Sequence, residues 1–219
     1  MPNEYMPIGF SLKGKRCLVV GGGHVALRKV EALLDYDCKL VVVAPEPVEK
    51  IGYFAEKGSL SLEKREYRSP EAGEYGLVIS ASDDKAVNES VAADCGKAGV
   101  PVNVVDNPPL CSFIFPAVVR RDSMSVAILT DGKAPFLAGN LRLILEEIFP
   151  DRWKKIVKLA GLFRGMVRRK WPKTPKKQGL CYGKFVSADW TEILKKNKKD
   201  EEMESVLEGM LNVPDEEEK

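Results

Sequence analysis

The sequence has little histidine and no paired cysteines. His24 is the only histidine among 219 residues, which excludes a histidine-cluster metal site and a Ser-His-Asp triad. The five cysteines form no C-x-x-C pair and are odd in number, so we expect neither a zinc site nor a disulfide framework. Proton transfer must therefore rely on Asp, Glu, Lys or Tyr, and no metal-binding residue is predicted.

Long apolar runs are also missing. No stretch of 18 or more apolar residues occurs, so no membrane partner is expected. Residues 1–5 lack the basic and apolar regions of a signal peptide, which favours a cytoplasmic location. The hydrophobic fraction of 44% and the charged fraction of 30% are typical of globular proteins. The length allows one full core and a smaller second unit.

The first half of the sequence alternates between strand and helix patterns. Lys15–Val20 is a short apolar strand that runs into glycines, and Leu40–Ala44 is a second, stopped by Pro45. The segment between them has helical periodicity, which makes a βαβ unit of about 30 residues. Further strands are predicted at 60–67, 77–81 and 101–106, with helices at 48–57 and 86–98. Continuous apolar strands indicate a parallel sheet covered on both faces, so the fold class is α/β and Rossmann-like.

The pattern changes after residue 114. Segments 115–121 and 124–130 read as an antiparallel hairpin, and a helix with one apolar face follows Pro135. A further helix is expected around 153–167. Beyond Trp171, Pro172 and Pro175 break the chain, leaving room for one short helix within 189–211 and an acidic tail at 214–219. We therefore predict a dinucleotide-binding domain at 1–114, a hairpin-helix segment at 115–150 and a helical C-terminal region at 151–219.

The segment Gly21-Gly22-Gly23-His24-Val25-Ala26 fits G-x-G-x-x-A between a strand and a helix. In this pattern Gly21 permits a tight turn, Gly23 lets the backbone approach a pyrophosphate, and Ala26 keeps helix and strand close. The N–H groups at the helix start then bind the phosphates. The alternative is a glycine-rich turn in an α/β protein that binds no nucleotide.

Two acids stand at strand ends where ligands bind in open α/β sheets. Glu46 follows the second strand and could bind the ribose hydroxyls, which favours NAD over NADP; it could equally be an acid at a helix N-terminus. Asp106 ends the fifth strand and could act as a base beside the nicotinamide. Its alternative role is to form the turn before Asn107-Pro108.

Residues 150–180 contain eleven basic residues and one acid. This segment could be a solvated helix face, a nucleic-acid patch or a clamp for a polyanionic small molecule. Trp153 and Phe163 fall on the apolar stripe of the predicted helix, so they are expected in a core. Few aromatics are interleaved with the bases, and we therefore expect no nucleic-acid partner.

Taken together, these motifs resemble the precorrin-2 dehydrogenase/sirohydrochlorin ferrochelatase family over roughly residues 8–170. The matching residues are Leu12-x-Gly14-Lys15, Val19-Val20-Gly21-Gly22-Gly23-x-Val25-Ala26-x-Arg28-Lys29, Val43-Ala44-Pro45, Ala81-Ser82-Asp83-Asp84-x-x-Val87-Asn88, Asn103-Val104-Val105-Asp106-x-Pro108, Ser112-Phe113-x-x-Pro116-Ala117 and Gly132-x-Ala134-Pro135.

The resemblance implies an NAD-binding Rossmann domain, a homodimer formed through the hairpin-helix segment, and a helical region that closes the site. It implies oxidation of precorrin-2 to sirohydrochlorin with NAD, and insertion of Fe²⁺ in several members. Asp106 falls on the family's key carboxylate. The family's NAD contacts fall on His24, Val25, Pro45 and Glu46. Together with the loop residues Gly21, Gly22 and Gly23, and with Ser82 and Asn103, these are the predicted cofactor-binding residues.

The sequence also departs from the family pattern. Relatives often have Ser-Gly-Gly-x-Ser-Pro where this chain has Thr130-Asp131-Gly132-Lys133-Ala134-Pro135, so a hydroxyl that could cap the helix is lost at Ala134. No methyltransferase domain follows, and we expect a stand-alone enzyme. Two alternatives stay open: a dehydrogenase without chelatase activity, and a protein that binds NAD and a tetrapyrrole without turnover.

Overall fold

The structure is a computed structural model that describes residues 4–197 and 199–214. Most of the predicted acidic tail, residues 215–219, lies outside the described residues. The chain forms two compact units. One comprises the residues up to Pro116 together with Leu129–Pro135, and the other comprises Ala117–Ile128 and the chain from Phe136 onward. Each unit is described by itself.

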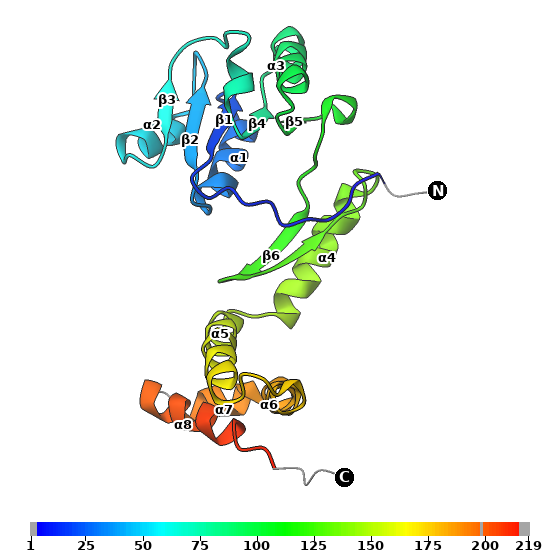
Figure 1. Ribbon diagram of the computed structural model, residues 1–219. Coiled ribbons are helices and arrows are strands. Elements are labelled where there is room, and N and C mark those ends of the chain that lie inside the picture. The colour runs from blue at the N-terminus through cyan, green and yellow to red at the C-terminus, as the bar shows by residue number, and fades with distance from the viewer. Residues whose placement is uncertain (1–3, 198, 215–219) are drawn as a thin grey trace. The chain divides into compact units, whose positions relative to one another are not determined.

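The first unit contains a parallel sheet of five strands in the order β3-β2-β1-β4-β5 (Figure 1). The strands are β1 (Arg16–Val20), β2 (Lys39–Val43), β3 (Ser61–Glu63), β4 (Leu77–Ser80) and β5 (Val102–Val104). The helices are α1 (His24–Leu34), α2 (Glu49–Glu56) and α3 (Lys85–Ala98), with short 3₁₀ turns η1 (Glu71–Glu74) and η2 (Pro108–Leu110). The predicted Rossmann-like α/β fold is confirmed.

The sheet is buried on both faces because successive side chains of a strand point to opposite sides. In β1, Cys17 and Val19 pack with Val30 of α1 in one core cluster. Leu18 and Val20 join a second cluster, which includes residues of α3. Burying one Val or Leu side chain stabilises the fold by about 1.5–3 kcal/mol. The continuous apolar strands of the sequence therefore reflect two helical layers.

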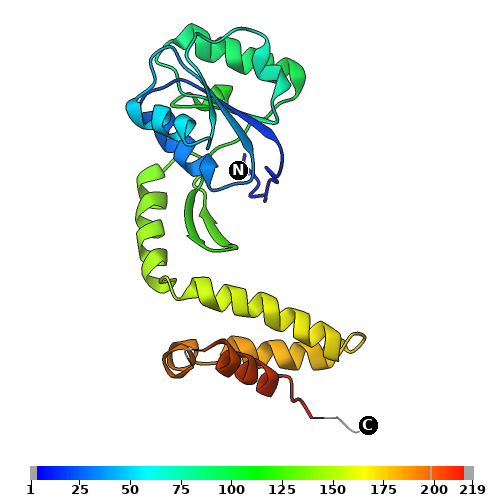
Figure 2. The same ribbon diagram turned by 90° about the vertical axis from the view of Figure 1, so that its left-hand side faces the viewer.

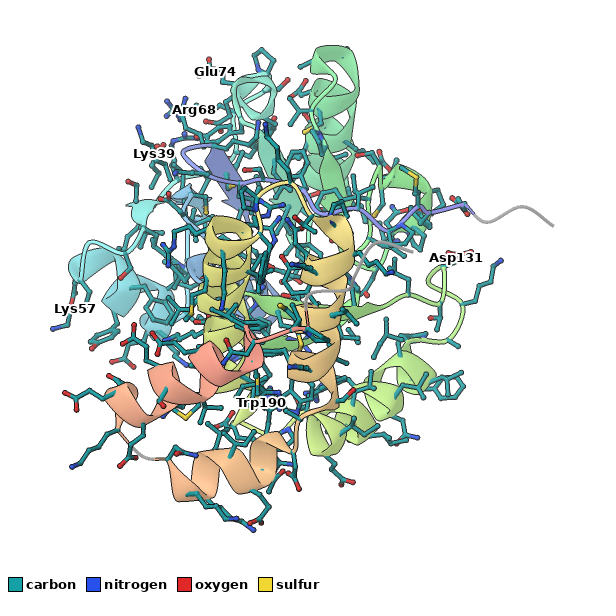
Figure 3. The ribbon with its side chains drawn as sticks, turned by 60° about the horizontal axis from the view of Figure 1, so that its bottom comes forward. Lys39, Lys57, Arg68, Glu74, Asp131 and Trp190 are labelled. Atoms are coloured by element: carbon teal, nitrogen blue, oxygen red, sulfur yellow. The ribbon has the colours of Figure 1, made fainter. Side chains whose placement is uncertain are left out.

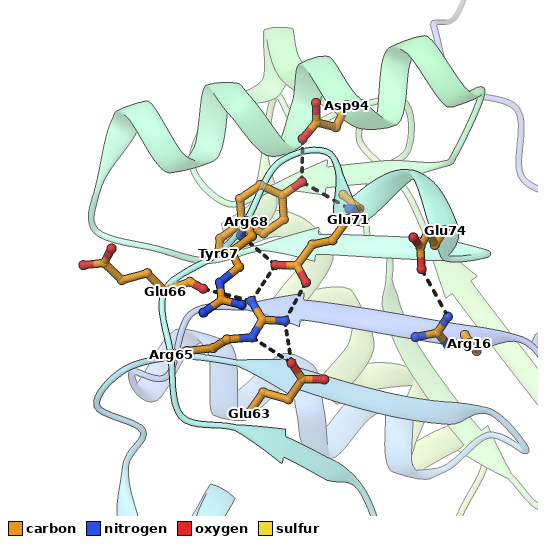
Figure 4. Close-up of polar contacts among 10 residues, drawn as sticks. Arg16, Glu63, Arg65, Glu66, Tyr67, Arg68, Glu71, Glu74 and Asp94 are labelled. Atoms are coloured by element: carbon orange, nitrogen blue, oxygen red, sulfur yellow. Dashed lines mark hydrogen bonds and ion pairs between the residues drawn. The ribbon is translucent and has the colours of Figure 1, made fainter.

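Polar contacts fix the connection between β3 and β4 (Figure 4). Arg65 pairs with Glu63 and with Glu71, whose Oε2 lies 2.6 Å from Nη2 of the arginine. The hydroxyl of Tyr67 donates to the buried Asp94 of α3 at 2.7 Å. These contacts hold the connecting loop against α3.

The second unit begins with an antiparallel hairpin of β6 (Ala117–Arg121) and β7 (Met124–Ile128). Asp122, at the tight turn, has φ +57°, a left-handed conformation that Asp tolerates better than most residues. Arg121 donates from Nε to the carbonyl of Phe149 at 2.5 Å. This bond joins the hairpin to the end of α4 (Pro135–Ile148).

Four helices follow: α5 (Trp153–Lys170), α6 (Pro175–Ser187), α7 (Trp190–Lys196) and α8 (Asp200–Met210). Figure 2 shows α5 and α6 side by side. Phe163 stacks on Phe185 with ring centroids 5.3 Å apart, and Trp190, labelled in Figure 3, donates from Nε1 to the carbonyl of Phe185 at 2.8 Å. Phe163 is fully buried and Trp153 packs against the same cluster, so their predicted place in a core is confirmed.

The prediction of one short helix after Trp171 was wrong, because the structure has three. Pro175 does not interrupt a helix but is the first residue of α6. The N–H group at this position makes no hydrogen bond within a helix, so its absence in proline costs nothing. Asp189 caps α7 by accepting from the N–H groups of Thr191 and Glu192. The helices are held by their shared core rather than by strong local propensity.

Candidate functional site

The order of the strands creates a crevice between β1 and β4. After β1 the chain crosses one face of the sheet through α1, and after β4 it crosses the other face through α3. In open α/β sheets, ligands bind outside the carboxyl ends of the strands where the chain changes face in this way. Gly21–Gly23 follow β1 there, and Ala81 and Ser82 follow β4. The predicted glycine loop therefore lies at the switch point of the sheet.

Close backbone approaches explain two of the glycines. Gly21 has φ +115°, and a Cβ at this residue would lie 2.3 Å from the carbonyl oxygen of Ala81. A Cβ on Gly22 would lie 2.7 Å from Cα of Pro47 and 2.8 Å from Cβ of Ala44. Any larger side chain must displace backbone at these positions. The loop after β1 is thus packed directly against the loops after β4 and β2.

The start of α1 is open to an anion. Gly23 is its N-cap residue, and no side chain of the described residues caps the helix. A Cβ on Gly23 would meet no described atom within 4 Å. The N–H groups of the first turn lack intrahelical partners, the turn contains no acid, and the helix dipole adds positive potential. These residues fit the pyrophosphate of a dinucleotide.

The neighbouring helix α3 differs in this respect. The side chain of Asp84 accepts from the N–H groups of Ala86 at 2.8 Å and Val87 at 3.4 Å. Its carboxylate therefore occupies the position that an external anion would need. At this edge of the sheet, the start of α1 is therefore uncapped by any described side chain, whereas the start of α3 is capped by its own Asp84.

The predicted ribose-binding segment lies beside the glycine loop. Pro45 and Glu46 are exposed after β2, and the carbonyl oxygen of Glu46 would lie 3.1 Å from a Cβ on Gly22. The N–H of Val48 donates to the carbonyl of Gly22 at 2.9 Å. Helix α2 starts only at Glu49, which is the acid of its first turn. Glu46 is thus outside the helix, and its backbone lies next to the glycine loop.

Asp106 lies in an open cleft of about 590 Å³. It is exposed and has φ +57° in the turn after β5. Non-glycine residues in this region cost roughly 1–3 kcal/mol and cluster at functional sites. Asp106 therefore forms the turn and also lines the cleft, and its role as a base stays a prediction. The cleft is lined by Val25, Ala81, Ser82, Asp83, Lys85, Asn88, Glu89, Val105, Asp106 and Asn107.

The remaining predicted residues have different surroundings. Ser82 lines the cleft, whereas Asn103 is buried and its amide donates to the carbonyl of Phe113 at 3.0 Å. This bond, with contacts of the Cys111 thiol to Val104, secures the segment after β5. His24 is exposed at the first position of α1. Sequence reasoning missed Lys85 and Glu89, although Asp84 is a recognisable helix cap that places them on the first turns of α3.

Lys29 lies on α1 one turn after Val25, a residue that lines the cleft. Its ammonium nitrogen lies 4.2 Å from the ring centroid of Phe115. Burial lowers the pKa of Lys29, and the charge of Arg28 lowers it further, whereas Asp106 and Cys111 act in the opposite direction. Burial also raises the pKa of the Cys111 thiol. Lys29 is thus a half-buried cation within the electrostatic range of Asp106.

The described residues contain neither a metal-binding cluster nor a membrane-spanning helix. No group of three or more His, Cys, Asp or Glu side chains there could hold a metal ion. Within the same residues, no helix combines the length and apolarity needed to cross a membrane.

The sheet order, the open start of α1 and the cleft at the switch point define a dinucleotide-binding protein of the Rossmann class. A family model described as "Putative NAD(P)-binding" matches residues 8–117, and the chain belongs to this family. The predicted class of cofactor, a nicotinamide dinucleotide, is therefore confirmed.

Curated relatives named siroheme synthase are similar to most of the chain. One from Methylococcus capsulatus is 40% identical over 169 residues, which cover 77% of this chain and 36% of the relative. One from Saccharophagus degradans is 42% identical over 161 residues, covering 74% and 35%. The chain thus spans about a third of the length of these relatives. The predicted family resemblance is confirmed.

A solved structure, "SirC, precorrin-2 dehydrogenase", has the same fold. The TM-score is 0.65 at 22% sequence identity, and the match covers 94% of this chain and 97% of the other. The likeness therefore includes the helical second unit as well as the Rossmann unit.

Proposed function

We propose that this protein oxidises precorrin-2 to sirohydrochlorin with NAD. The observation that carries the proposal is the position of Asp106, a carboxylate in the same cleft as Val25 of the phosphate-loop helix. The siroheme synthase relatives and the precorrin-2 dehydrogenase of the same fold support the choice of substrate.

The residues proposed to hold NAD form two groups. Gly21, Gly22 and Gly23, with His24 and Val25, offer backbone to the pyrophosphate. Pro45 and Glu46 lie beside them, and the carboxylate of Glu46 would accept from ribose hydroxyls and repel a 2′-phosphate, which favours NAD over NADP. Ser82 lines the adjoining cleft, and Asn103 is buried in β5 with its amide bonded to the carbonyl of Phe113.

The proposed reaction removes a hydride and a proton from precorrin-2. Bound NAD supplies the hydride acceptor. A carboxylate oxygen of Asp106 accepts the proton from precorrin-2 and then releases it to water. The products are therefore sirohydrochlorin, NADH and one proton. A well-placed general base typically contributes about 10²–10⁴-fold to the rate.

The basic segment is proposed to attract the polycarboxylate substrate. On α5, Lys154 pairs with Asp151 at 3.1 Å and Lys158 lies 3.9 Å from Asp122. Arg164, Arg168 and Arg169 are exposed on the same helix. Clustered cations steer anionic ligands and raise the association rate at low salt.

We further propose a homodimer formed through α4 and the β6–β7 hairpin. The side chains of Leu137, Leu141, Ile144 and Ile148 recur at helical spacing on α4 and are all exposed. A two-stranded sheet is marginally stable by itself, and an exposed apolar stripe marks an interaction surface. A second copy of the chain would cover both.

A cytoplasmic location is proposed as well. All five cysteines are free thiols, which is expected in a reducing compartment.

The test is an anaerobic assay with protein, NAD and precorrin-2. We expect NADH and sirohydrochlorin to form together, much faster than in a protein-free blank. Binding of both ligands without NADH formation would instead identify a non-catalytic carrier, and no binding of precorrin-2 would refute the choice of substrate.

Insertion of Fe²⁺ into sirohydrochlorin is a second proposed activity of the same cleft. Metal insertion must remove pyrrole N–H protons, and Asp106 offers a base for this step. Adding Fe²⁺ to the completed assay tests it. Uptake at the rate of the blank would restrict the protein to dehydrogenation.

A further inference from the structure

The loop after β4 is held by one side chain of α3, that of Asn88. Its Nδ2 donates to the carbonyl oxygen of Ser82 at 2.8 Å, and its Oδ1 accepts from the hydroxyl of Ser80 at 2.6 Å. Ser80 is the last residue of β4 and is fully buried. Because a carbonyl oxygen can only accept, the amide nitrogen must face Ser82, which fixes the orientation of the carboxamide. Asn88 therefore bridges the residues on either side of Ala81.

The backbone that Asn88 holds lies against the glycine loop. A Cβ on Gly21 would lie 2.3 Å from the carbonyl oxygen of Ala81 and 3.0 Å from the nitrogen of Ser82. Ala81, Ser82 and Asn88 itself also line the cleft that contains Asp106. The Ala81–Ser82 peptide is thus one wall of the cleft, and the position of this wall depends on the carboxamide of Asn88.

The glycine loop has separate anchors on the side of β2. The N–H of Gly21 donates to the carbonyl of Val43 at 2.9 Å, and the carbonyl of Gly22 accepts from the N–H of Val48 at 2.9 Å. Neither hydrogen bond involves α3 or the loop after β4. Loss of the Asn88 contacts should therefore loosen the wall of the cleft and leave the glycine loop in place.

The two halves of a bound dinucleotide are expected to lie on these two sides. Glu46, proposed to bind the adenosine ribose, follows β2, whereas Asp106 follows β5 and lines the cleft. The nicotinamide must lie beside the base, so it belongs in the cleft. We propose that Asn88 is a positioning residue that holds the Ala81–Ser82 wall of the cleft in place for the nicotinamide half of NAD. This assignment of the cleft rests on the proposed function, whereas the contacts of Asn88 belong to the protein alone.

The test compares the binding of NAD with that of ADP-ribose, which lacks the nicotinamide, by isothermal titration calorimetry. Asn88→Ala removes both hydrogen bonds, so we expect about tenfold weaker binding of NAD and an affinity for ADP-ribose within roughly twofold of wild type. Asn88→Asp keeps the acceptor for Ser80 but places a carboxylate oxygen against the carbonyl of Ser82. It should show the same selective loss.

The matched control is Tyr67→Phe, which also removes two hydrogen bonds next to α3. The Tyr67 hydroxyl donates to the buried Asp94 at 2.7 Å and accepts from the N–H of Ala72 at 3.2 Å. This variant should melt at a lower temperature with an unchanged ratio of NAD to ADP-ribose affinity. Ser80→Ala, which retains Asn88, provides the test if Asn88→Ala does not fold, and a selective loss of about threefold in NAD affinity is then expected.

An unchanged ratio of NAD to ADP-ribose affinity in the Asn88 and Ser80 variants would overturn the proposal. This holds whether both ligands bind as in wild type or both bind more weakly to the same extent. A failure of wild type to oxidise precorrin-2 would refute the proposed function, but it would leave a selective loss of NAD affinity standing.

Steady-state kinetics give a second readout. In Asn88→Ala the KM for NAD should rise while the KM for precorrin-2 stays near the wild-type value. A rise in the KM for precorrin-2 alone would show that Asn88 borders the substrate instead, and would contradict the proposal.

Discussion

Asp106 combines a backbone requirement with a chemical one. Its left-handed conformation ends β5 abruptly, and the same turn exposes its carboxylate in the cleft. Asp and Asn are the non-glycine residues that best tolerate this conformation. The residue type therefore lowers the conformational cost of the turn, and it also places an acidic residue in the lining of the cleft.

Asp106→Asn separates these two roles. Because Asn retains the turn but cannot accept the proton, turnover should fall by about 10²–10⁴-fold while the Kd for NAD stays near wild type. Steady-state kinetics and an NAD titration check this, with Asp37→Asn, an exposed residue before β2, as the control. Undiminished turnover in Asp106→Asn would remove this carboxylate from the mechanism.

Gly22 shows how the fold positions the cofactor site. In Gly22→Ala the new Cβ would press on Pro47 and Ala44. We therefore expect a loss of about 1–3 kcal/mol in the free energy of unfolding and at least roughly tenfold weaker NAD binding.

Gly52→Ala in α2 is the matched control, since its Cβ would meet no described atom within 4 Å. It should stabilise the protein by about 0.5–1 kcal/mol with unchanged NAD affinity. Equal behaviour of the two variants in thermal melts and NAD titrations would contradict this packing argument.

At the scale of elements, α1 and α3 start at the same edge of the sheet but have different roles. Glycine at the N-cap leaves α1 open, whereas Asp84 closes α3. Both features are local in the sequence, and the glycine loop was predicted from its residues. The surroundings of Lys29 were not predictable, because they depend on Phe115, which lies far away in the chain.

The helices after Trp171 show where local signals mislead. A proline within a chain predicts a break, yet Pro175 occupies the first position of α6, where proline is favoured. Gly179 and Gly183 also lower the helix propensity of this segment. Burial of Cys181 and Phe185 against α5 outweighs that cost, and such tertiary packing cannot be read from single residues.

The exposed face of α4 gives a prediction at this scale. Ile144→Glu places a charge in the centre of the apolar stripe, where the side chain is 46% exposed in one chain. We expect a shift from dimer to monomer in size-exclusion chromatography with light scattering, because burying an unpaired carboxylate is costly. Leu162→Glu on α5, also at an exposed leucine, should leave the dimer intact. A monomeric wild type would contradict the proposed assembly.

At the scale of the whole molecule, the chain has two units with separate cores, and each contains a different part of the proposed function. The Rossmann unit contains the proposed cofactor site and the candidate base, and the helical unit contains the exposed cations of α5 and the apolar stripe of α4. The Rossmann fold followed from strand and helix periodicity and from one glycine loop. The sequence does not predict that Lys85 and Glu89 line the cleft, because this depends on α3 and the Asp106 turn lying at the same edge of the folded sheet.

The most direct test of the proposed chemistry is the ratio of products in a single anaerobic reaction. NADH and sirohydrochlorin are followed together by their absorption after NAD and precorrin-2 are mixed with the protein. A hydride transferred from precorrin-2 to NAD requires that the two products appear at equal rates, one for one. Sirohydrochlorin without NADH, or neither product above the protein-free blank, would contradict an NAD-dependent precorrin-2 dehydrogenase.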